Sequence, residues 1–204
     1  MTSTYLIAAL VTLAFTIVLT VAGLGAAFIL VPIYLALGVS MHSAQATALL
    51  LNAIAMAFAC ARYIPAKLVD FRIAIPIVIV ATILSPLGAY TSSFVPVTTL
   101  KWMFIGFLVF AGAMMLFYKP KPREVASRGE VVGVGLGVGG AAGFLGGMLG
   151  VGGGNFVVPA LVWLGLDAKR AAGTTAFVVV FASFTGFLGQ ASVASIDLTL
   201  LAWT

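Results

Sequence analysis

The sequence contains few charged residues, and this shortage decides the class of protein. Only 7% of its 204 residues are Asp, Glu, Lys or Arg, whereas soluble domains carry about 25%. Hydrophobic residues make up 63% of the chain, which leaves too little polar surface to cover a soluble core. Only helices and closed barrels satisfy the backbone in lipid. We therefore predict an all-α, multi-pass integral membrane protein embedded in a lipid bilayer.

Other shortages exclude further classes of protein. No charged side chain lies in the middle of an apolar run, so a proton relay lacks the groups that it needs. The only histidine, His42, lies at the edge of a run, and the only cysteine, Cys60, has no partner for a disulfide or a metal site. We therefore expect no enzyme, no metal and no cofactor. The ten Lys and Arg flank apolar runs, which favours contacts with lipid headgroups and not with nucleic acid.

Long apolar runs divide the chain into two halves. A spanning helix needs roughly 20 apolar residues, so the first and fifth runs are too long for one straight crossing. We predict a first transmembrane repeat at 1–118, a cytoplasmic linker at 119–130 and a second repeat at 131–204. The expected runs are 5–38, 43–61, 71–94, 100–118, 131–165 and 171–190, with a seventh beginning near Leu198.

An internal repeat relates the two long runs. An offset of 127 positions aligns them without a gap and places Gly23 on Gly150 and Gly25 on Gly152. We infer a polytopic helix bundle built from two homologous four-segment repeats with glycine-broken first segments. The second repeat lacks the counterparts of the last two segments, so we expect a fragment or a truncated gene product. The further identities pair Val31-Pro32, Leu37-Gly38, Ala44 and Thr47 with Val158-Pro159, Leu164-Gly165, Ala171 and Thr174.

Positive charge predicts the orientation of the chain. The segments 62–72 and 119–130 are rich in Lys and Arg and lie two crossings apart, so we assign both to the cytoplasm. Lys101 is the exception on the other side. If the first long run crosses once, the halves are parallel, and if it crosses twice, they are inverted. A cytoplasmic Lys169-Arg170 pair favours inversion, and the sequence leaves both arrangements open.

The glycine-rich stretch at 143–159 admits three interpretations. A nucleotide loop is excluded because no Gly-Lys-Ser/Thr follows. Glycines four residues apart indicate close helix packing. From Gly150 to Pro159, three consecutive glycines and a proline instead predict a broken helix. Transporters use such breaks to direct the N–H groups of half-helices at anions. The packing glycines are Gly135, Gly139, Gly143 and Gly147.

Some polar residues lie inside the apolar runs that follow the two breaks. Their hydroxyl and amide groups either bond back to their own helix or line a path through the membrane, and the sequence leaves both open. Thr47 and Thr174 match across the repeat. The polar residues are Gln45, Thr47 and Asn52 in the second run and Thr174, Thr175, Ser183, Thr185 and Gln190 in the sixth.

The glycine-proline pattern resembles that of the TauE/SafE family of membrane transporters, the sulfite exporters. The resemblance is carried by Gly150 to Pro159, followed by Gly165, Ala171 and Gly173-Thr174. The first copy is weaker, with Ala26 and Ala27 where the second copy has glycines. The resemblance implies a duplicated unit in a bacterial-type inner membrane that exports or takes up small anions, in several members sulfite or organosulfur compounds.

Two functional hypotheses follow. The first is a secondary transporter of a small anion such as sulfite, a sulfonate or another organosulfur compound. The alternative is a non-transporting membrane scaffold or an inactive, truncated remnant of a transporter. A homo-oligomer is compatible with either hypothesis. The substrate-binding residues predicted by the first are Gly25, Pro32, Thr47, Gly152, Gly153, Gly154, Asn155, Pro159, Thr174 and Thr175.

Overall fold

The computed structural model describes residues 12–17, 19–20, 23, 25–117 and 128–193. These ranges contain helices and turns and no strand, so the all-α prediction is confirmed. Residues 12–17 and 19–20 are helical. The other helices are α2 (Ala27–Ala36), α3 (Met41–Tyr63), α4 (Phe71–Ser92), α5 (Val97–Phe117), α6 (Arg128–Leu149), α7 (Gly154–Trp163) and α8 (Ala168–Val193).

Four of these helices are long and apolar enough to cross a membrane, namely α3, α4, α6 and α8. The outer face of α4 illustrates why this surface fits lipid. Ile75, Ile79 and Ile83 recur every four residues and are each at least half exposed. Such a continuous apolar stripe is unfavourable in water and favourable in a bilayer. The chain is a multi-pass membrane protein.

The structure describes only the last three residues of the predicted linker 119–130. Helix α6 begins at Arg128, so the last three residues of the predicted linker 119–130 are helical. The last proline of the predicted linker is Pro122. Every residue after it has a backbone N–H, so no proline prevents the helix from starting before residue 131. Residues 118–127 and the predicted seventh run near Leu198 lie outside the described residues.

Among the described residues of each long run, the helix is interrupted at glycines. Gly150, Gly152 and Gly153 have φ of +74°, +75° and +77°, and the matching Gly23 and Gly25 have +72° and +79°. L-residues with a side chain rarely adopt this left-handed backbone. The predicted break extended to Val-Pro, but the helix resumes earlier. Pro32 and Pro159 lie inside α2 and α7.

The spacing of the elements follows the offset found in the sequence. Helices α2 and α7 begin and end 127 positions apart, and so do the starts of α3 and α8. Gly38 and Gly165, which follow α2 and α7, share left-handed φ of +86° and +94°. This spacing is what the predicted duplication requires, and the common origin of the two halves stays a prediction.

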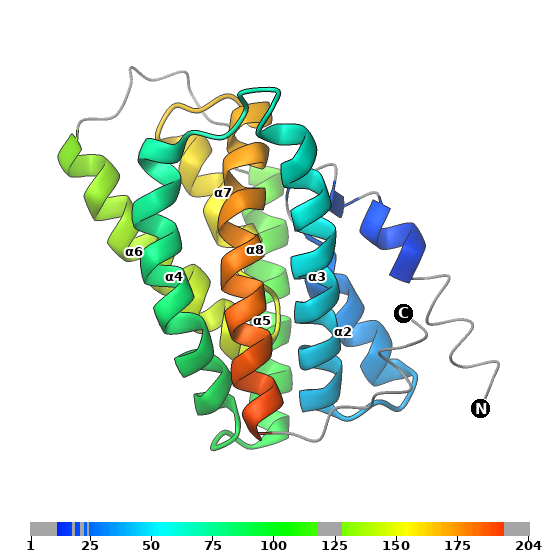
Figure 1. Ribbon diagram of the computed structural model, residues 1–204. Helices are drawn as coiled ribbons and strands as arrows, with labels where there is room; N and C mark the ends of the chain where they lie inside the picture. Colours follow the sequence, from blue (N-terminus) through cyan, green and yellow to red (C-terminus); the bar gives the residue numbers. More distant parts are fainter. Residues whose placement is uncertain (1–11, 18, 21–22, 24, 118–127, 194–204) are drawn as a thin grey trace.

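Equivalent helices run in opposite directions. Asn52 in the middle of α3 bonds to Ser183 on α8, and Gln45 near the start of α3 bonds to Gln190 near the end of α8. The two helices are therefore antiparallel (Figure 1). Helix α7 runs back to the end of the bundle where α4, α6 and α8 begin, whereas α2 runs to the opposite end. Of the two arrangements that the sequence left open, the structure has the inverted one.

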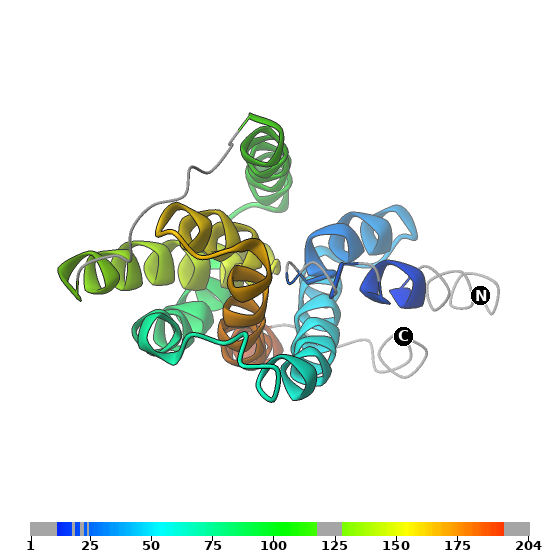
Figure 2. The same cartoon turned by 90° about the horizontal axis from the view of Figure 1, so that it is seen from above.

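Glycines of α6 form a close seam with α4, which runs beside it in the same direction (Figures 1 and 2). A Cβ on Gly139 would lie 2.9 Å from the carbonyl oxygen of Ile77, and one on Gly143 would lie 2.6 Å from that of Ala81. Any side chain here would push the two backbones apart. The packing interpretation of Gly135 to Gly147 is thus confirmed.

Positive charge gathers at one end of the bundle. The end at which α3 finishes and α4, α6 and α8 begin carries nearly all Lys and Arg of the described part of the chain. Lys101, near the start of α5, lies at the opposite end. The end at which α4, α6 and α8 begin is called the cationic end below. Its members are Arg62, Lys67, Arg72, Lys169 and Arg170.

Candidate functional site

The two glycine breaks meet at one side chain, Asn52 of α3. Its Oδ1 accepts a hydrogen bond from the backbone N–H of Ala26 at 3.0 Å, directly before α2. Its Nδ2 donates to Oγ of Ser183 on α8, also at 3.0 Å. A Cβ on Gly152 would lie 2.5 Å from that Nδ2, and one on Gly25 would lie 2.9 Å from Cγ of Asn52. The breaks of both halves therefore pack against the same buried amide.

The amino termini of two half-helices point into this region. The first N–H groups of a helix have no acceptor within it, and the helix dipole adds partial positive charge at that end. At the start of α2, the Oδ1 of Asn52 accepts a hydrogen bond from one of these N–H groups, that of Ala26. Helix α7 is preceded by Gly153, which provides no side-chain cap. Two inward-facing, partly uncapped amino termini make this region attractive to negative charge.

Asn155 adds a polar side chain to the first turn of α7. It is 5% exposed, and its Nδ2 has no hydrogen-bond partner among the described residues. Buried amide groups are nearly always paired, so an unpaired donor beside an uncapped helix start is available to bind a hydrogen-bond acceptor. A small anion supplies such an acceptor.

A separate polar network closes the other side of the break, at the carboxyl end of α6. Gln45 donates to the carbonyl oxygen of Met148 at 3.0 Å, and Gln190 lies 3.3 Å from that of Gly147. Gln190 also contacts Gln45 and Ser92, at 3.2 and 3.1 Å. These contacts satisfy carbonyl groups that the end of a helix leaves without partners. The network thus has a structural role at the end of α6, next to the break.

Of the predicted site residues, those of the breaks come together. Gly25 and Gly152 both pack against Asn52, and Gly153, Gly154 and Asn155 continue from Gly152 into α7. The two prolines lie farther along their helices. Pro159 lines a different cavity, of about 300 Å³, together with Phe110 and Trp163.

The three predicted threonines lie near two opposite ends of the bundle, Thr174 and Thr175 at one end and Thr47 at the other. Thr174 is in the second turn of α8, where its hydroxyl accepts the backbone N–H of Asp70 at 3.0 Å. That contact joins the start of α4 to α8 at the cationic end, away from the breaks. Thr175 lies beside it, and Thr47 lies near the opposite end, in the second turn of α3. Both are fully buried, and neither hydroxyl has a partner among the described residues.

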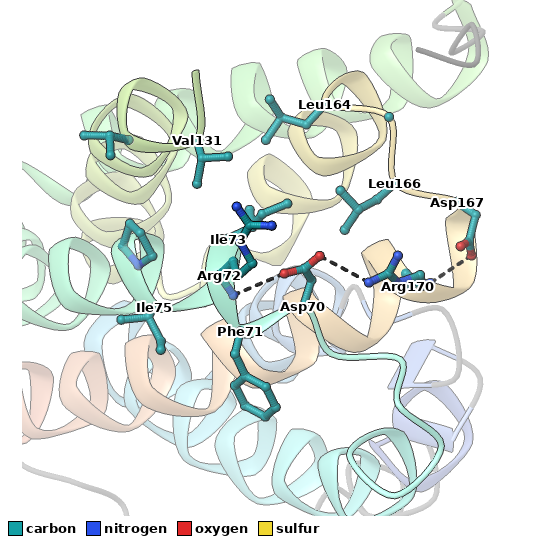
Figure 3. Close-up of a pocket in the computed structure, with 13 residues that line it drawn as sticks. Asp70, Phe71, Arg72, Ile73, Ile75, Val131, Leu164, Leu166, Asp167 and Arg170 are labelled. Atoms are coloured by element: carbon teal, nitrogen blue, oxygen red, sulfur yellow. Dashed lines mark hydrogen bonds and ion pairs between the residues drawn. The ribbon is translucent and has the colours of Figure 1, made fainter. Parts of the chain in front are cut away.

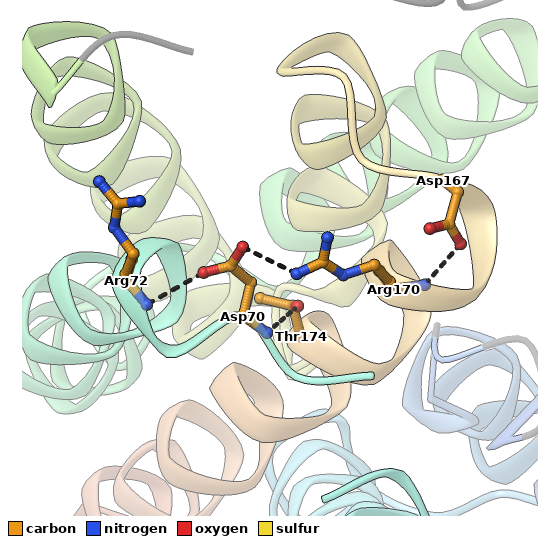
Figure 4. Close-up of polar contacts among 5 residues, drawn as sticks. All are labelled: Asp70, Arg72, Asp167, Arg170 and Thr174. Atoms are coloured by element: carbon orange, nitrogen blue, oxygen red, sulfur yellow. Dashed lines mark hydrogen bonds and ion pairs between the residues drawn. The ribbon is translucent and has the colours of Figure 1, made fainter. Parts of the chain in front are cut away.

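A cavity of about 520 Å³ also lies at the cationic end and not at the breaks. Figure 3 shows it between the starts of α4, α6 and α8 and the end of α7. Figure 4 shows the polar contacts at its rim, where Arg170 pairs with Asp70 at 3.2 Å. Its walls are mainly apolar, so it differs in chemistry from the site at Asn52.

Asn52 and Ser183 are polar residues within apolar runs, and neither belongs to the site predicted from the sequence. Their importance depends on the antiparallel packing of α3 and α8, which brings them together. No pattern along either helix shows this contact. The described part of the chain contains no group of three or more His, Cys, Asp or Glu that could hold a metal ion.

Comparison with known proteins adds an independent line of evidence. The model of the family described as "Sulfite exporter TauE/SafE" matches residues 7–204. The "Probable membrane transporter protein YunE" of Bacillus subtilis (strain 168) is 30% identical over 142 residues, which cover 61% of this chain and 52% of that protein. The chain thus matches about half the length of this relative. No solved structure matches the chain.

Proposed function

Because the chain belongs to the sulfite exporter TauE/SafE family, we propose that it acts as a secondary transporter of a small anion in the plasma membrane. The observation that carries this proposal is the meeting of the two breaks at Asn52. Helices α2 and α7 both begin there and run to opposite ends of the bundle. Transporters with inverted repeats place their substrate sites at such paired breaks.

The chemistry of the region favours an anion over a cation. The available hydrogen-bond donors are the backbone N–H groups at the start of α7 and the Nδ2 of Asn155. Both lie at the positive end of a helix dipole. The described parts of the membrane-crossing helices carry charged side chains only near their ends. Binding by dipoles and amides, without a fixed counter-charge, is weak enough to permit release on the other side.

Sulfite and organic sulfonates suit these donors well. Each presents several oxygen atoms that accept hydrogen bonds from separate directions, as successive N–H groups in the first turn of a helix require. The proposed ligands are the N–H groups of Gly153 to Asn155 and the Asn155 side chain. This choice of substrate class rests on the donor set together with the family description.

The positions of Thr47 and Thr175 favour a role in lining a path through the bundle over a role in one binding site. They lie near opposite ends of the antiparallel pair α3 and α8, and each carries a buried hydroxyl without a hydrogen-bond partner in the described part of the chain. We assign them to the path on either side of Asn52. Pro32, Pro159 and Thr174 then keep structural roles in α2, in α7 and at the start of α4.

Flux measurements on the full chain in proteoliposomes test the proposal. Asn155→Leu keeps the approximate size of the side chain and removes its donor. A hydrogen bond to a charged group is worth about 1.5–3 kcal/mol, so sulfite or sulfonate uptake should fall about tenfold or more at low substrate concentration. Thr185→Val is the matched control, because the Thr185 hydroxyl bonds back to Phe181 in its own helix.

The outcome that overturns the proposed site is unchanged flux in Asn155→Leu with protein that folds normally. Absence of flux of sulfite, sulfonates and other small anions in the unmodified protein would overturn the transport proposal itself. A stability screen with the same anions provides a second readout, since a ligand that binds the folded state raises its stability with concentration.

A further inference from the structure

The cavity at the cationic end has the chemistry of an amphipathic ligand site, which the transport proposal leaves unused. Its volume of about 520 Å³ falls within the range of roughly 300–1,000 Å³ typical of ligand pockets. Apolar residues form most of its walls, and the charged groups that line it come from the starts of α4 and α8 (Figure 3). The apolar residues are Phe71, Ile73, Ile75, Pro76, Val131, Val132, Leu164 and Leu166.

The cavity lies at one end of the membrane-crossing helices, which is the end of a span where lipid headgroups are expected. It is bounded by the first turns of α4, α6 and α8, and all three are membrane-crossing helices. Below it, the glycine seam holds α4 and α6 together, whereas their first turns diverge (Figure 1). Ile75 and Val132 are about half exposed, so the cavity has an apolar side that faces the surrounding lipid.

The charges at the rim leave one cation available. Asp70 accepts from the backbone N–H of Arg72 and pairs with Arg170, and Asp167 accepts from the N–H groups of Lys169 and Arg170. Both acids are thus occupied at helix starts. The Arg72 guanidinium has no acidic partner among the described residues, and Figure 3 shows it directed into the cavity.

We propose that this cavity binds an anionic phospholipid, with its phosphate on the Arg72 guanidinium and its acyl chains against Ile75 and Val132. The planar guanidinium suits the oxygens of a phosphodiester. Basic pockets between membrane helices on the cytoplasmic side are typical sites for acidic headgroups. A soluble anion would gain nothing from the apolar walls, whereas a lipid uses both parts of the cavity. This inference does not depend on which substrate is transported.

Binding of short-chain lipids to the full chain in neutral detergent tests the proposal. The probes are dioctanoyl phosphatidylglycerol, dioctanoyl phosphatidylcholine and sn-glycerol 3-phosphate, and bound molecules are counted by native mass spectrometry during titration. Phosphatidylglycerol should bind more tightly than the other two. Because one Arg near the membrane surface contributes about 1 kcal/mol to anionic lipid binding, Arg72→Gln should raise the dissociation constant about fivefold.

Matched variants make the result specific. Lys101→Gln removes one positive charge from the opposite end of the bundle and should leave phosphatidylglycerol binding unchanged. Arg72→Lys keeps the charge and should retain most of the affinity. Val132→Asp places a charge in the apolar wall of the cavity and should therefore weaken lipid binding. Arg72 is exposed, so its variants should fold. The comparison of the three probes uses the unmodified protein and does not depend on any variant.

Three results would each overturn the proposal. Equal affinity for phosphatidylcholine would show that charge is not recognised. Equal affinity for sn-glycerol 3-phosphate would show a site for soluble phosphates. An equal loss in Arg72→Gln and Lys101→Gln would show general attraction between anionic lipid and a basic protein. Because none of these results concerns flux, they are distinguishable from a failure of the transport proposal.

Discussion

Asn52 and Ser183 join the two halves of the protein at their breaks. The Asn52 amide donates to the Ser183 hydroxyl at 3.0 Å and accepts from the N–H of Ala26 at 3.0 Å. One side chain of α3 thereby contacts α8 and the start of α2, and it packs against Gly152 at the other break. Movement of either half-helix relative to the other therefore has to involve Asn52.

Loss of the Asn52 amide should destabilise the fold. Asn52→Leu leaves the Ser183 hydroxyl and the Ala26 N–H buried without partners, at a cost of about 1–3 kcal/mol for each unsatisfied group. Ser183→Ala removes one bond and should cost less. Cys60 is the only cysteine and is buried, so its reaction with a thiol-specific fluorophore on heating reports unfolding. A double-mutant cycle should show coupling between the two positions, and strictly additive effects would contradict the contact.

Gly152→Ala should be more harmful than Gly38→Ala. Both glycines have left-handed φ, of +75° and +86°, so both substitutions incur backbone strain of roughly 1–2 kcal/mol. A Cβ on Gly152 would also meet Asn52, whereas one on Gly38 has nothing within 4 Å. The difference in unfolding temperature between the two variants therefore measures the crowding at the break. Equal losses would mean that the break has room to relax.

A side chain in the seam between α4 and α6 should separate the helices. Gly143→Val would push against the Ala81 backbone, whose carbonyl oxygen would lie 2.6 Å from the new Cβ. Overpacking of a close contact costs typically 1–3 kcal/mol, occasionally more. Gly133→Val is the control in the same helix, because nothing lies within 4 Å of a Cβ there. We expect a clear loss of unfolding temperature in the first variant and little change in the second.

The ion pair between Asp70 and Arg170 should contribute little to stability compared with the helix cap that Asp70 provides. The Arg170 and Asp70 side chains are 46% and 21% exposed, and exposed pairs are worth about 0–1 kcal/mol. Asp70→Asn keeps the cap of α4 and removes the charge, so its effect should be small. Asp70→Ala also removes the cap, at about 1 kcal/mol more. A larger loss in Asp70→Asn than in Asp70→Ala would contradict this ranking.

Much of the fold was predictable because it depends on short-range properties of the chain. Apolar runs of sufficient length predicted α3, α4, α5 and α8 to within a few residues at each end. The glycines at 23, 25, 150 and 152 predicted both breaks, since only glycine readily takes the left-handed backbone. The breaks were predicted to extend as far as the prolines. This was wrong, because Pro32 and Pro159 lie inside the short helices α2 and α7.

The candidate site was predictable only in part. Glycine spacing indicated Gly25 and Gly152 to Asn155, and these residues come together at Asn52. Thr47 and Thr174 match across the repeat and were both predicted to line the substrate path, and the structure places them near opposite ends of the bundle. Sequence identity across a repeat gives equivalent positions, and their distance depends on how the halves are oriented.

The sequence by itself determined that this protein lies in a membrane, that it is helical and where its helices are interrupted. These properties follow from hydrophobicity and backbone freedom, which act within one segment. The tertiary structure decided that the halves are inverted, that α6 packs on α4 through its glycines and that Asn52 meets Ser183. The contacts behind these features join residues up to 145 positions apart, and they depend on the fit between separate helix surfaces, which no local pattern encodes.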